Sequence, residues 1–395
     1  MGGLGRRLRP AGAMATVLAV AAVTAAVAGC GGHDDAAGTK QQIAIGFQGP
    51  LSGDNQQLGI NAYDGVLTAV DAANRQGTLP FTLRIVAADD QGSPEQGPTA
   101  AQKLVDNGQV VAVVGPIFSG PTKSSESLYS AAHLLSVSPS ATNPQLTSLG
   151  FSSFFRVIAP DTVQGAAAAD YLAKALKAKR VFSLDDASDY GTGLSAALER
   201  GLKADDVTVT HDTANPTKDY TSEATKIVAA HPDAVYYSGY YSEFALLVKA
   251  LRGKGYEGTI VAGDGSNDDQ LIAQAGADTA EGVLLTCACG DANSDPKAAA
   301  FVAEYRRVNS DSKPGTYSGE AYDATQAVIS VLAKEGPGAT RASVLRGFRD
   351  VDMPGVTKRI MFDSHGEVQG STVYVYEIKG GQRVVLGPTN ALLKP

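Results

Sequence analysis

The stretch VYYSGYYSEFALL, residues 235–247, predicts a buried strand that turns directly into a helix. Its first three residues are β-branched or aromatic, which favours a strand. Ser238–Gly239 interrupts that run, and apolar residues then repeat at helical spacing from Phe244 to Leu251, where Gly253 ends the pattern. A strand that leads at once into a helix is the basic unit of an α/β protein.

Four tyrosines crowd this corner in a chain that has no tryptophan. We expect Tyr236 and Tyr237 to end the strand inside the core. Tyr240 is expected to contact a ligand, and Tyr241 to pack at the edge of a lobe. Tyrosine offers a large contact area at a small cost in conformational entropy, which suits a site that closes around a ligand.

The same alternation recurs along most of the chain. Nine apolar, β-rich runs predict strands: Ile43–Phe47, Phe81–Ala88, Val110–Gly115, Leu134–Ser138, Val181–Asp185, Val207–Asp212, Ala234–Ser238, Thr259–Gly263 and Val283–Thr286. Several are apolar almost throughout, which is typical of parallel strands covered on both faces. Nine strands with their helices exceed one open sheet of usual size, so we expect an α/β fold with two lobes.

Two local patterns add to this prediction. Asp161 and Gln164 stand three residues apart before an apolar helical run, as in a capping box. Near the end, residues 371–387 alternate on either side of Lys379–Gln382, which predicts a β-hairpin.

The N-terminus predicts export. Three arginines precede an uncharged run, residues 11–28, and the small residues before Cys30 complete the pattern of a signal peptide, residues 1–29. The segment around Cys30 resembles a bacterial lipobox, in which the cysteine is lipidated and becomes the mature N-terminus. A transmembrane helix and an ordinary export signal are the alternatives. Residues 30–41 are small and polar, which indicates a flexible tether.

Charge limits the choice of partner. The whole chain carries a net charge of −8, and the signal peptide holds three arginines and no acid, so the mature chain is more acidic by three units. An acidic chain with scattered basic residues is poorly suited to nucleic acid or to an anionic membrane surface.

The other two cysteines, Cys287 and Cys289, are two residues apart. In a strand they point to the same face, although closing a disulfide over one residue is strained. The alternative is a pair of small buried residues. A metal site needs more ligands than the neighbouring sequence provides, and we expect neither a metal nor a cofactor.

Polar side chains follow five of the predicted strands. In open α/β sheets, ligands bind beyond the carboxyl ends of the strands. The side chains found there are Ser119, Ser140, Thr142, Tyr190, Tyr240 and Asp264. Hydroxyl and backbone N–H groups at helix starts hold anions, whereas a carboxylate flanked by tyrosine rings attracts an ammonium. Together they suit an amino acid zwitterion, although each taken alone is more often a helix cap or a core residue.

At this point the sequence resembles the periplasmic leucine/isoleucine/valine-binding protein family, whose members are substrate-binding lipoproteins of ABC importers. The resemblance runs from Ile43 to the final hairpin. The motifs that carry it are GPLSGDNQQLG, AADDQGSPEQ, SPSATNPQLT, DYGTGL, VYYSGYYSE, GDGSND and AEGVLLT.

The resemblance implies a type I periplasmic-binding fold, with two Rossmann-like lobes joined by a three-segment hinge. Residues 42–160 and 289–361 would form the N-terminal lobe, and residues 161–288 and 362–395 the C-terminal lobe. It also implies roles for the site residues. Ser119, Thr142 and the Ser140 backbone would hold a carboxylate, Tyr240 and Asp264 would hold an ammonium, and Tyr190 and Leu58 would line the wall. Ala141 is a further expected ligand-binding residue.

Three positions depart from the family pattern. Asp264 stands where branched-chain binders usually have Glu, and the missing methylene retracts the carboxylate by about 1.5 Å. Leu58 stands where an aromatic residue can occur. The disulfide of the N-terminal lobe has no counterpart, because residue 118 is Phe and residues 89–93 contain no Cys.

An enzyme is the rival interpretation, and the sequence offers little for it. It contains no G-x-S-x-G, H-E-x-x-H or G-x-x-x-x-G-K-[ST] motif, and its five histidines are scattered. We therefore predict a monomeric, lipid-anchored, extracytoplasmic binding protein that delivers an apolar amino acid to ABC permease and ATPase subunits. A short amide or aromatic acid as ligand, or a ligand-sensing subunit for a membrane partner, remain alternatives.

Overall fold

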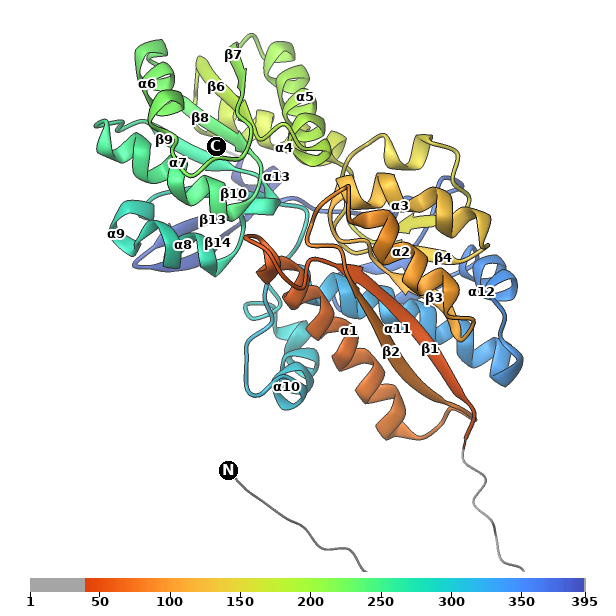
Figure 1. Cartoon of the computed structure of the whole chain (residues 1–395). Coiled ribbons are helices and arrows are strands. Elements are labelled where there is room, and N and C mark those ends of the chain that lie inside the picture. The colour runs from red at the N-terminus through yellow and green to blue at the C-terminus, as the bar shows by residue number, and fades with distance from the viewer. Residues whose placement is uncertain (1–39, 394–395) are drawn as a thin grey trace, which may run out of the picture. The chain divides into compact units, whose positions relative to one another are not determined.

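The computed structural model describes residues 40–393, so Cys30, the predicted signal peptide and nearly all of the predicted tether lie outside the described residues. Two sheets organise the described part, and each is covered by helices (Figure 1). The α/β fold predicted from the alternation of strands and helices is confirmed.

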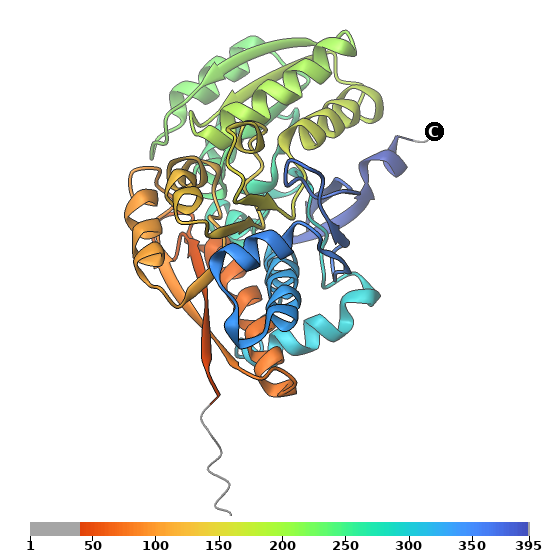
Figure 2. The same ribbon diagram turned by 90° about the vertical axis from the view of Figure 1, so that its right-hand side faces the viewer.

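The first sheet contains five parallel strands in the order β2-β1-β3-β4-β5. They are β1 (Gln42–Gly49), β2 (Thr82–Asp89), β3 (Val110–Val114), β4 (Leu135–Ser138) and β5 (Phe154–Arg156). Its helices are α1 (Gln56–Gln76), α2 (Gly97–Asp106), α3 (Ser119–Ala131), α10 (Ala299–Val308), α11 (Ser318–Glu335) and α12 (Arg341–Phe348). α11 packs against α1 although the two are far apart in sequence (Figures 1 and 2).

The second sheet contains seven strands in the order β14-β13-β10-β9-β8-β6-β7. They are β6 (Arg180–Asp185), β7 (Thr208–Thr213), β8 (Ala234–Ser238), β9 (Thr259–Ala262), β10 (Leu284–Cys287), β13 (Tyr374–Lys379) and β14 (Gln382–Pro388). The last two form the predicted hairpin, and β13 pairs antiparallel with β10.

Helices cover both faces of this sheet. They are α4 (Asp161–Asp170), continued by a π-helical turn at Tyr171–Ala175, α5 (Asp189–Ala204), α6 (Thr221–Ala230), α7 (Tyr241–Gly253), α8 (Asp269–Ala275), α9 (Ala277–Ala280) and α13 (Thr389–Leu392). The opening stretch of the sequence forms β8 and the start of α7, as predicted. Tyr236 and Tyr237 are fully buried, because β8 lies in the middle of the sheet.

The chain passes between the two lobes three times: after β5, after β10, and after the short pair β11 (Asp352–Pro354) and β12 (Arg359–Met361). The segment from Phe362 to Gln369 still pairs with the first lobe, because Arg156 N donates to Gly366 O and Gln369 N donates to Met361 O. We therefore propose that the third crossing begins after Gln369, a few residues beyond the boundary expected from the sequence.

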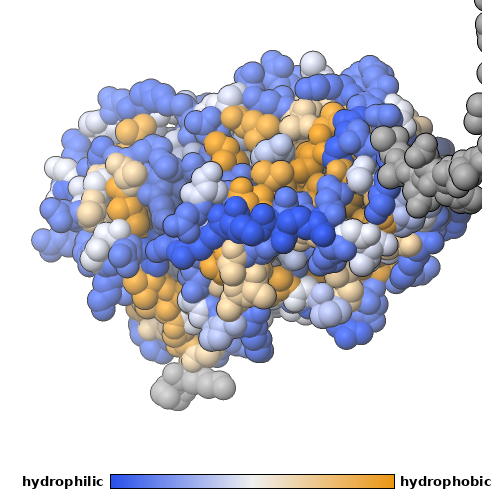
Figure 3. Space-filling view, turned by 90° about the horizontal axis from the view of Figure 1, so that it is seen from below, coloured by the Kyte–Doolittle hydropathy of each residue, from blue (hydrophilic) through white to orange (hydrophobic). Residues whose placement is uncertain are grey.

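No helix within residues 40–393 is long and apolar enough to cross a membrane. Figure 3 shows one face of the molecule on which hydrophilic residues predominate, with smaller hydrophobic patches between them.

Candidate ligand-binding site

A small cavity lies where strand ends and helix starts of the two lobes meet. It is lined by Ile117, Phe118, Ser119, Ser140, Tyr190, Tyr240, Gly265 and Tyr317. Its volume is about 10 Å³, close to the least that one water molecule needs. The side chains around it therefore leave almost no free space at this position.

Four of the predicted site residues line this cavity: Ser119, Ser140, Tyr190 and Tyr240. The other four are fully buried and are not among the lining residues: Leu58, Ala141, Thr142 and Asp264. Leu58 belongs to the core around α1, whereas Ala141 and Thr142 follow Ser140 directly. The roles predicted for all eight residues stay predictions.

Aromatic rings from both lobes form the wall of the cavity. The ring of Phe118 lies 4.2 Å from that of Tyr240, and Tyr240 lies 5.3 Å from Tyr190, measured between ring centroids. Tyr240 stands immediately before α7, and Tyr190 lies in the first turn of α5. Glycine at position 265 leaves room for the Tyr190 ring, because a Cβ there would lie 2.8 Å from that ring.

Hydroxyl groups occupy the side formed by the first lobe. Ser119, at the start of α3, accepts a hydrogen bond from Asn143 N at 3.2 Å, so its own proton is free to be donated. Ser140 Oγ donates to Ile117 O at 2.5 Å. Ser138 Oγ holds this loop from within, since it accepts from Ala141 N and donates to Pro116 O. Ser119 is therefore the hydroxyl best placed to donate to an anionic group.

A buried arginine supports the same loop from behind. Arg156, on β5, donates to the carbonyls of Ala141 and Asn143 at 3.0 and 2.8 Å, and its guanidinium pairs with Glu367. These bonds tie the carbonyls of Ala141 and Asn143 to the guanidinium.

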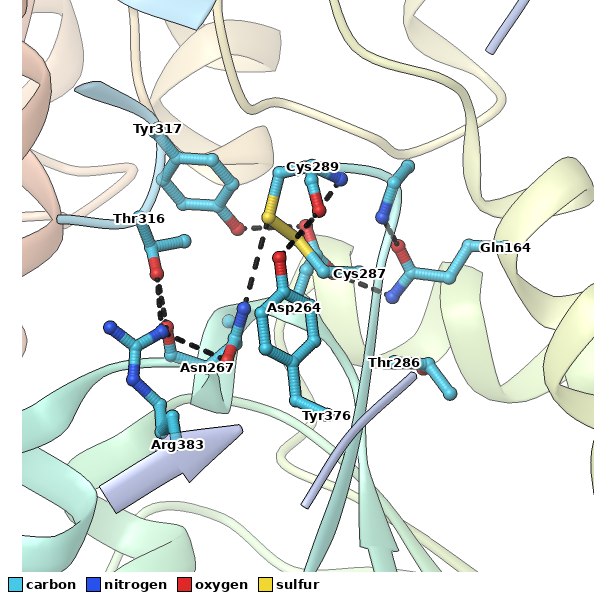
Figure 4. Close-up of a disulfide and its surroundings, with 12 residues drawn as sticks. Gln164, Asp264, Asn267, Thr286, Cys287, Cys289, Thr316, Tyr317, Tyr376 and Arg383 are labelled. Carbon is cyan, nitrogen blue, oxygen red and sulfur yellow. Dashed lines mark hydrogen bonds between the residues drawn. A yellow bond between two sulfur atoms is a disulfide. The ribbon is translucent and has the colours of Figure 1, made fainter. Parts of the chain in front are cut away.

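On the side of the second lobe, Asp264 is fully buried and accepts three hydrogen bonds. Tyr190 Oη and Gln164 Nε2 donate to Oδ1 at 2.6 and 2.8 Å, and Tyr317 Oη donates to Oδ2 at 2.7 Å. Figure 4 shows Tyr317 and Gln164 approaching Asp264 from opposite sides. All three donors are neutral, so they do not cancel the charge of the carboxylate.

Burial raises the pKa of Asp264, and the hydrogen bonds from Tyr190, Tyr317 and Gln164 oppose that rise. Asp161, also fully buried, has its pKa raised by burial and by the nearby charge of Asp264. The pKa of Tyr240 is raised by burial and then by four carboxylates around it, those of Asp186, Asp264, Asp161 and Asp90. Several carboxyl groups therefore lie close together in this part of the site.

The predicted capping box is wrong. α4 begins without a side-chain cap, and neither carboxylate oxygen of Asp161 has a hydrogen-bond partner among the described residues. Gln164 instead donates to Asp264 and accepts from Ala288 N at 3.2 Å. The Gln164 side chain makes these tertiary hydrogen bonds in place of the local bond to the helix start that a capping box requires.

The predicted site residues omit several members of the site, among them Phe118, Gln164 and Tyr317. Phe118 directly precedes Ser119, and the family pattern marks this position only by the absence of a cysteine. Tyr317 precedes α11, far along the chain from the strand ends that predict the other site residues. The GTYSGE segment, with its tyrosine at a helix start, was the one available signal.

The two neighbouring cysteines form a disulfide in the structure, with their Cα atoms 5.0 Å apart (Figure 4). The bond encloses Ala288, whose N–H is held by Gln164, and it lies at the end of β10, where the chain leaves the second lobe. No cluster of three or more metal-ligating side chains occurs within residues 40–393.

Comparison with known proteins adds to this geometry. A family model described as periplasmic binding protein matches residues 42–382. The chain is 31% identical over 347 residues to the Leu/Ile/Val-binding protein BraC3 of Rhizobium johnstonii, covering 87% of this chain and 93% of that protein. It is 30% identical over 358 residues to the leucine-, isoleucine-, valine-, threonine-, and alanine-binding protein of Pseudomonas aeruginosa, covering 89% and 93%.

Among solved structures, the substrate binding protein LivJ of Streptococcus pneumoniae, a branched-chain amino acid transporter component in complex with isoleucine, superposes with a TM-score of 0.80. The two are 27% identical, and the match covers 88% of this chain and all of that one. The segment that the family model matches contains every strand of both sheets except most of β14, and every residue that lines the cavity. The chain therefore belongs to the periplasmic binding protein family.

Proposed function

We propose that the protein captures a small apolar amino acid, with a branched-chain amino acid as the first candidate, between its two lobes and delivers it to an ABC importer. Membership of the family makes the chain an extracytoplasmic solute-binding protein and not an enzyme. The names of its relatives support leucine, isoleucine and valine as the ligands to test first.

The observation that carries the proposal is the uncompensated charge of Asp264. A buried carboxylate with only neutral donors is costly, and an ammonium group is the partner that would stabilise it. The hydroxyl of Ser119 lines the same cavity and can donate to a carboxylate. Ser119 of the first lobe can donate to a carboxylate, and Asp264 of the second lobe can compensate an ammonium. An amino acid carries both of these groups.

A thermal-shift screen tests the ligand class. The panel contains the branched-chain amino acids, other apolar amino acids, short amides and small aromatic acids, and calorimetry then measures Kd for the hits. A ligand at 100 times its Kd stabilises the folded state by about 2.7 kcal/mol. We expect the largest shift with a branched-chain amino acid. A shift with amides or aromatic acids alone would contradict the proposal.

We further propose that Cys30 carries a lipid that holds the protein at the outer face of the membrane, where it meets the permease of an importer that also contains ATPase subunits. The support is the pattern of the N-terminal sequence. Cys30→Ser should release the protein from the membrane fraction or leave it unprocessed. A mature wild-type protein whose mass includes no lipid would contradict this proposal.

A further inference from the structure

The charge of Asp264 reaches the cavity through other side chains. Asp264 is fully buried and is not among the lining residues, whereas two of its three donors, Tyr190 and Tyr317, do line the cavity. A ligand in the cavity would therefore meet phenol oxygens before it met the carboxylate.

The two phenol oxygens differ in how many hydrogen bonds they can still accept. Each spends its single proton on Asp264, because the carboxylate is an acceptor only. Tyr190 Oη also accepts a hydrogen bond from Gly265 N at 3.0 Å. Tyr317 Oη makes no other hydrogen bond within residues 40–393. A phenol oxygen has two acceptor sites, so Tyr317 is the better acceptor for a donor on the ligand, and its bond to a carboxylate strengthens it in that role.

The backbone of Tyr317 adds an independent observation. It has φ 70°, in the left-handed region that bulky residues rarely adopt, at the position just before α11. Such a conformation costs about 1 kcal/mol or more, and strained residues of this kind cluster at active sites and ligand clamps. Gly or Asn would be the usual residue at this position.

The Tyr317–Asp264 bond also joins the two lobes. Tyr317 precedes α11, which packs on α1, β3 and β4 of the first lobe, whereas Asp264 follows β9 of the second sheet. Separating the lobes would break this bond and leave Asp264 with the two donors that come from its own lobe, Tyr190 and Gln164.

We infer that Tyr317 recognises the amino group of the ligand: its phenol oxygen, held by Asp264 across the closed cleft, accepts an N–H of the ammonium. Asp264 is then a positioning residue, which directs both phenol protons away from the ligand and supplies the negative charge through one intervening hydrogen bond. This arrangement also compensates for the shorter reach of Asp. The inference rests on the proposed function and specifies how its amine end is recognised.

The test compares ligands with and without an amino group. Calorimetry measures Kd for leucine, isoleucine and valine, and for the carboxylic acids that have the same carbon skeletons but no amino group, with wild-type protein and with Tyr317→Phe. Losing a hydrogen bond to a charged group should weaken binding of the amino acids about 10- to 100-fold. Binding of the desamino acids should change less than about threefold.

Tyr305→Phe is the matched control. Tyr305 is also buried beside α11 and donates to a carboxylate, that of Asp64 at 3.4 Å, but it does not line the cavity. It should leave the preference for amino acids over desamino acids unchanged.

The outcomes separate this inference from the proposed function. If wild-type protein binds no amino acid, the proposed function fails and the inference fails with it. If wild-type protein binds an amino acid and Tyr317→Phe binds it equally well, only the inference is overturned. Equal losses for the amino acids and the desamino acids would show a structural role for Tyr317 and would also overturn it.

Discussion

Asp264 is completely buried, and its hydrogen-bond donors are all neutral. Burial of an ion is expensive unless a counter-ion compensates it, and the described contacts of Asp264 include none. Under the proposed function, the compensating positive charge arrives with the ligand.

Asp264→Asn should nearly abolish binding of a branched-chain amino acid. Removing the carboxylate whose charge compensates a buried ammonium should cost about as much as breaking a buried ion pair, about 3–5 kcal/mol, or roughly 150- to 4,000-fold in Kd. Asp264→Glu keeps the charge, so Kd should stay within about tenfold of wild type. Calorimetry on both variants is the measurement. If the Asn variant binds with near-native affinity, Asp264 does not recognise an ammonium, and the proposal of an amino acid ligand fails as well.

Thr142→Val should weaken binding without destabilising the free protein. The Thr142 hydroxyl is buried and makes no hydrogen bond of good geometry, although it is close enough to Asp161 to favour the ionised carboxylate slightly. If the ligand carboxylate is its partner, the variant loses about 1.5–3 kcal/mol of binding. The midpoint of urea unfolding should be unchanged or higher. A Kd within threefold of wild type would place Thr142 outside the site.

Part of the site could be predicted from the sequence, because its residues follow strands that are easy to recognise. Ser119, Ser140, Tyr190 and Tyr240 were found by searching strand ends, and all four line the cavity. Tyr317 and Gln164 could not be found in this way. One stands before a helix of the other lobe, and the other lies inside a helix, so only the folded chain brings them to Asp264.

At the scale of elements, the nine strands predicted from apolar runs all form, with ends within two residues of those expected. Length explains the strands that were missed. β5, β11 and β12 have three residues each, too few to show an alternation. β5 nevertheless matters, because it carries Arg156 and leads into the first crossing between the lobes.

The Gln164 side chain of α4 links the first crossing between the lobes, which leads into α4, to the second crossing at Ala288. Gln164 bridges Asp264 and Ala288 N, so the start of α4 is tied to the segment enclosed by the disulfide. In Gln164→Leu, the buried Ala288 N–H loses its acceptor and Asp264 Oδ1 loses one of its two donors. The free energy of unfolding should fall by about 1–3 kcal/mol.

Urea unfolding of Gln164→Leu measures this cost, and Gln102→Leu is the control. Gln102 is exposed on α2 and bonds only to Asp106 one turn away, so its loss should change stability by about 0.5 kcal/mol or less. Equal effects of the two substitutions would mean that the bridge adds nothing to stability.

At the scale of the whole molecule, buried acids should make the protein more stable in mild acid. Burial raises the pKa of Asp90 to about 6, of Asp186 and Glu320 to about 7, and of Glu126 to about 8. The folded state then binds more protons than the unfolded state between about pH 4 and pH 8. Stability must therefore fall as pH rises through this range.

Scanning calorimetry of the free protein should show a higher melting temperature at pH 5.5 than at pH 8, by at least about 3 °C. Glu126→Gln should reduce the difference, because the amide cannot ionise at pH 8. A melting temperature that rises between pH 5.5 and pH 8 would show that these carboxylates keep ordinary pKa values in the folded protein.

Closure of the lobes is the remaining property of the whole molecule. Contacts between the lobes surround the cavity: Asn55 bonds to Glu243 at 3.1 Å and to Ser242 N at 3.2 Å, Gln57 N donates to Tyr241 Oη, and Lys123 pairs with Asp189 at 2.7 Å. A cavity of about 10 Å³ cannot admit an amino acid while these contacts hold. The lobes must separate for a ligand to enter, and hinge bending about the three crossings is the motion that the fold allows.

Small-angle scattering should therefore give a larger radius of gyration for the free protein than for the protein saturated with its best ligand. Asn55→Ala removes two bonds that only the closed lobes make, so it should raise Kd several-fold, mainly through faster dissociation, and leave the radius of the free protein unchanged. Lys249→Ala, on the same helix as Glu243 but exposed, should change neither quantity. An identical radius with and without ligand would mean that the protein is closed before binding, and the ligand would then have to enter by movement of the Phe118 and Tyr240 rings alone.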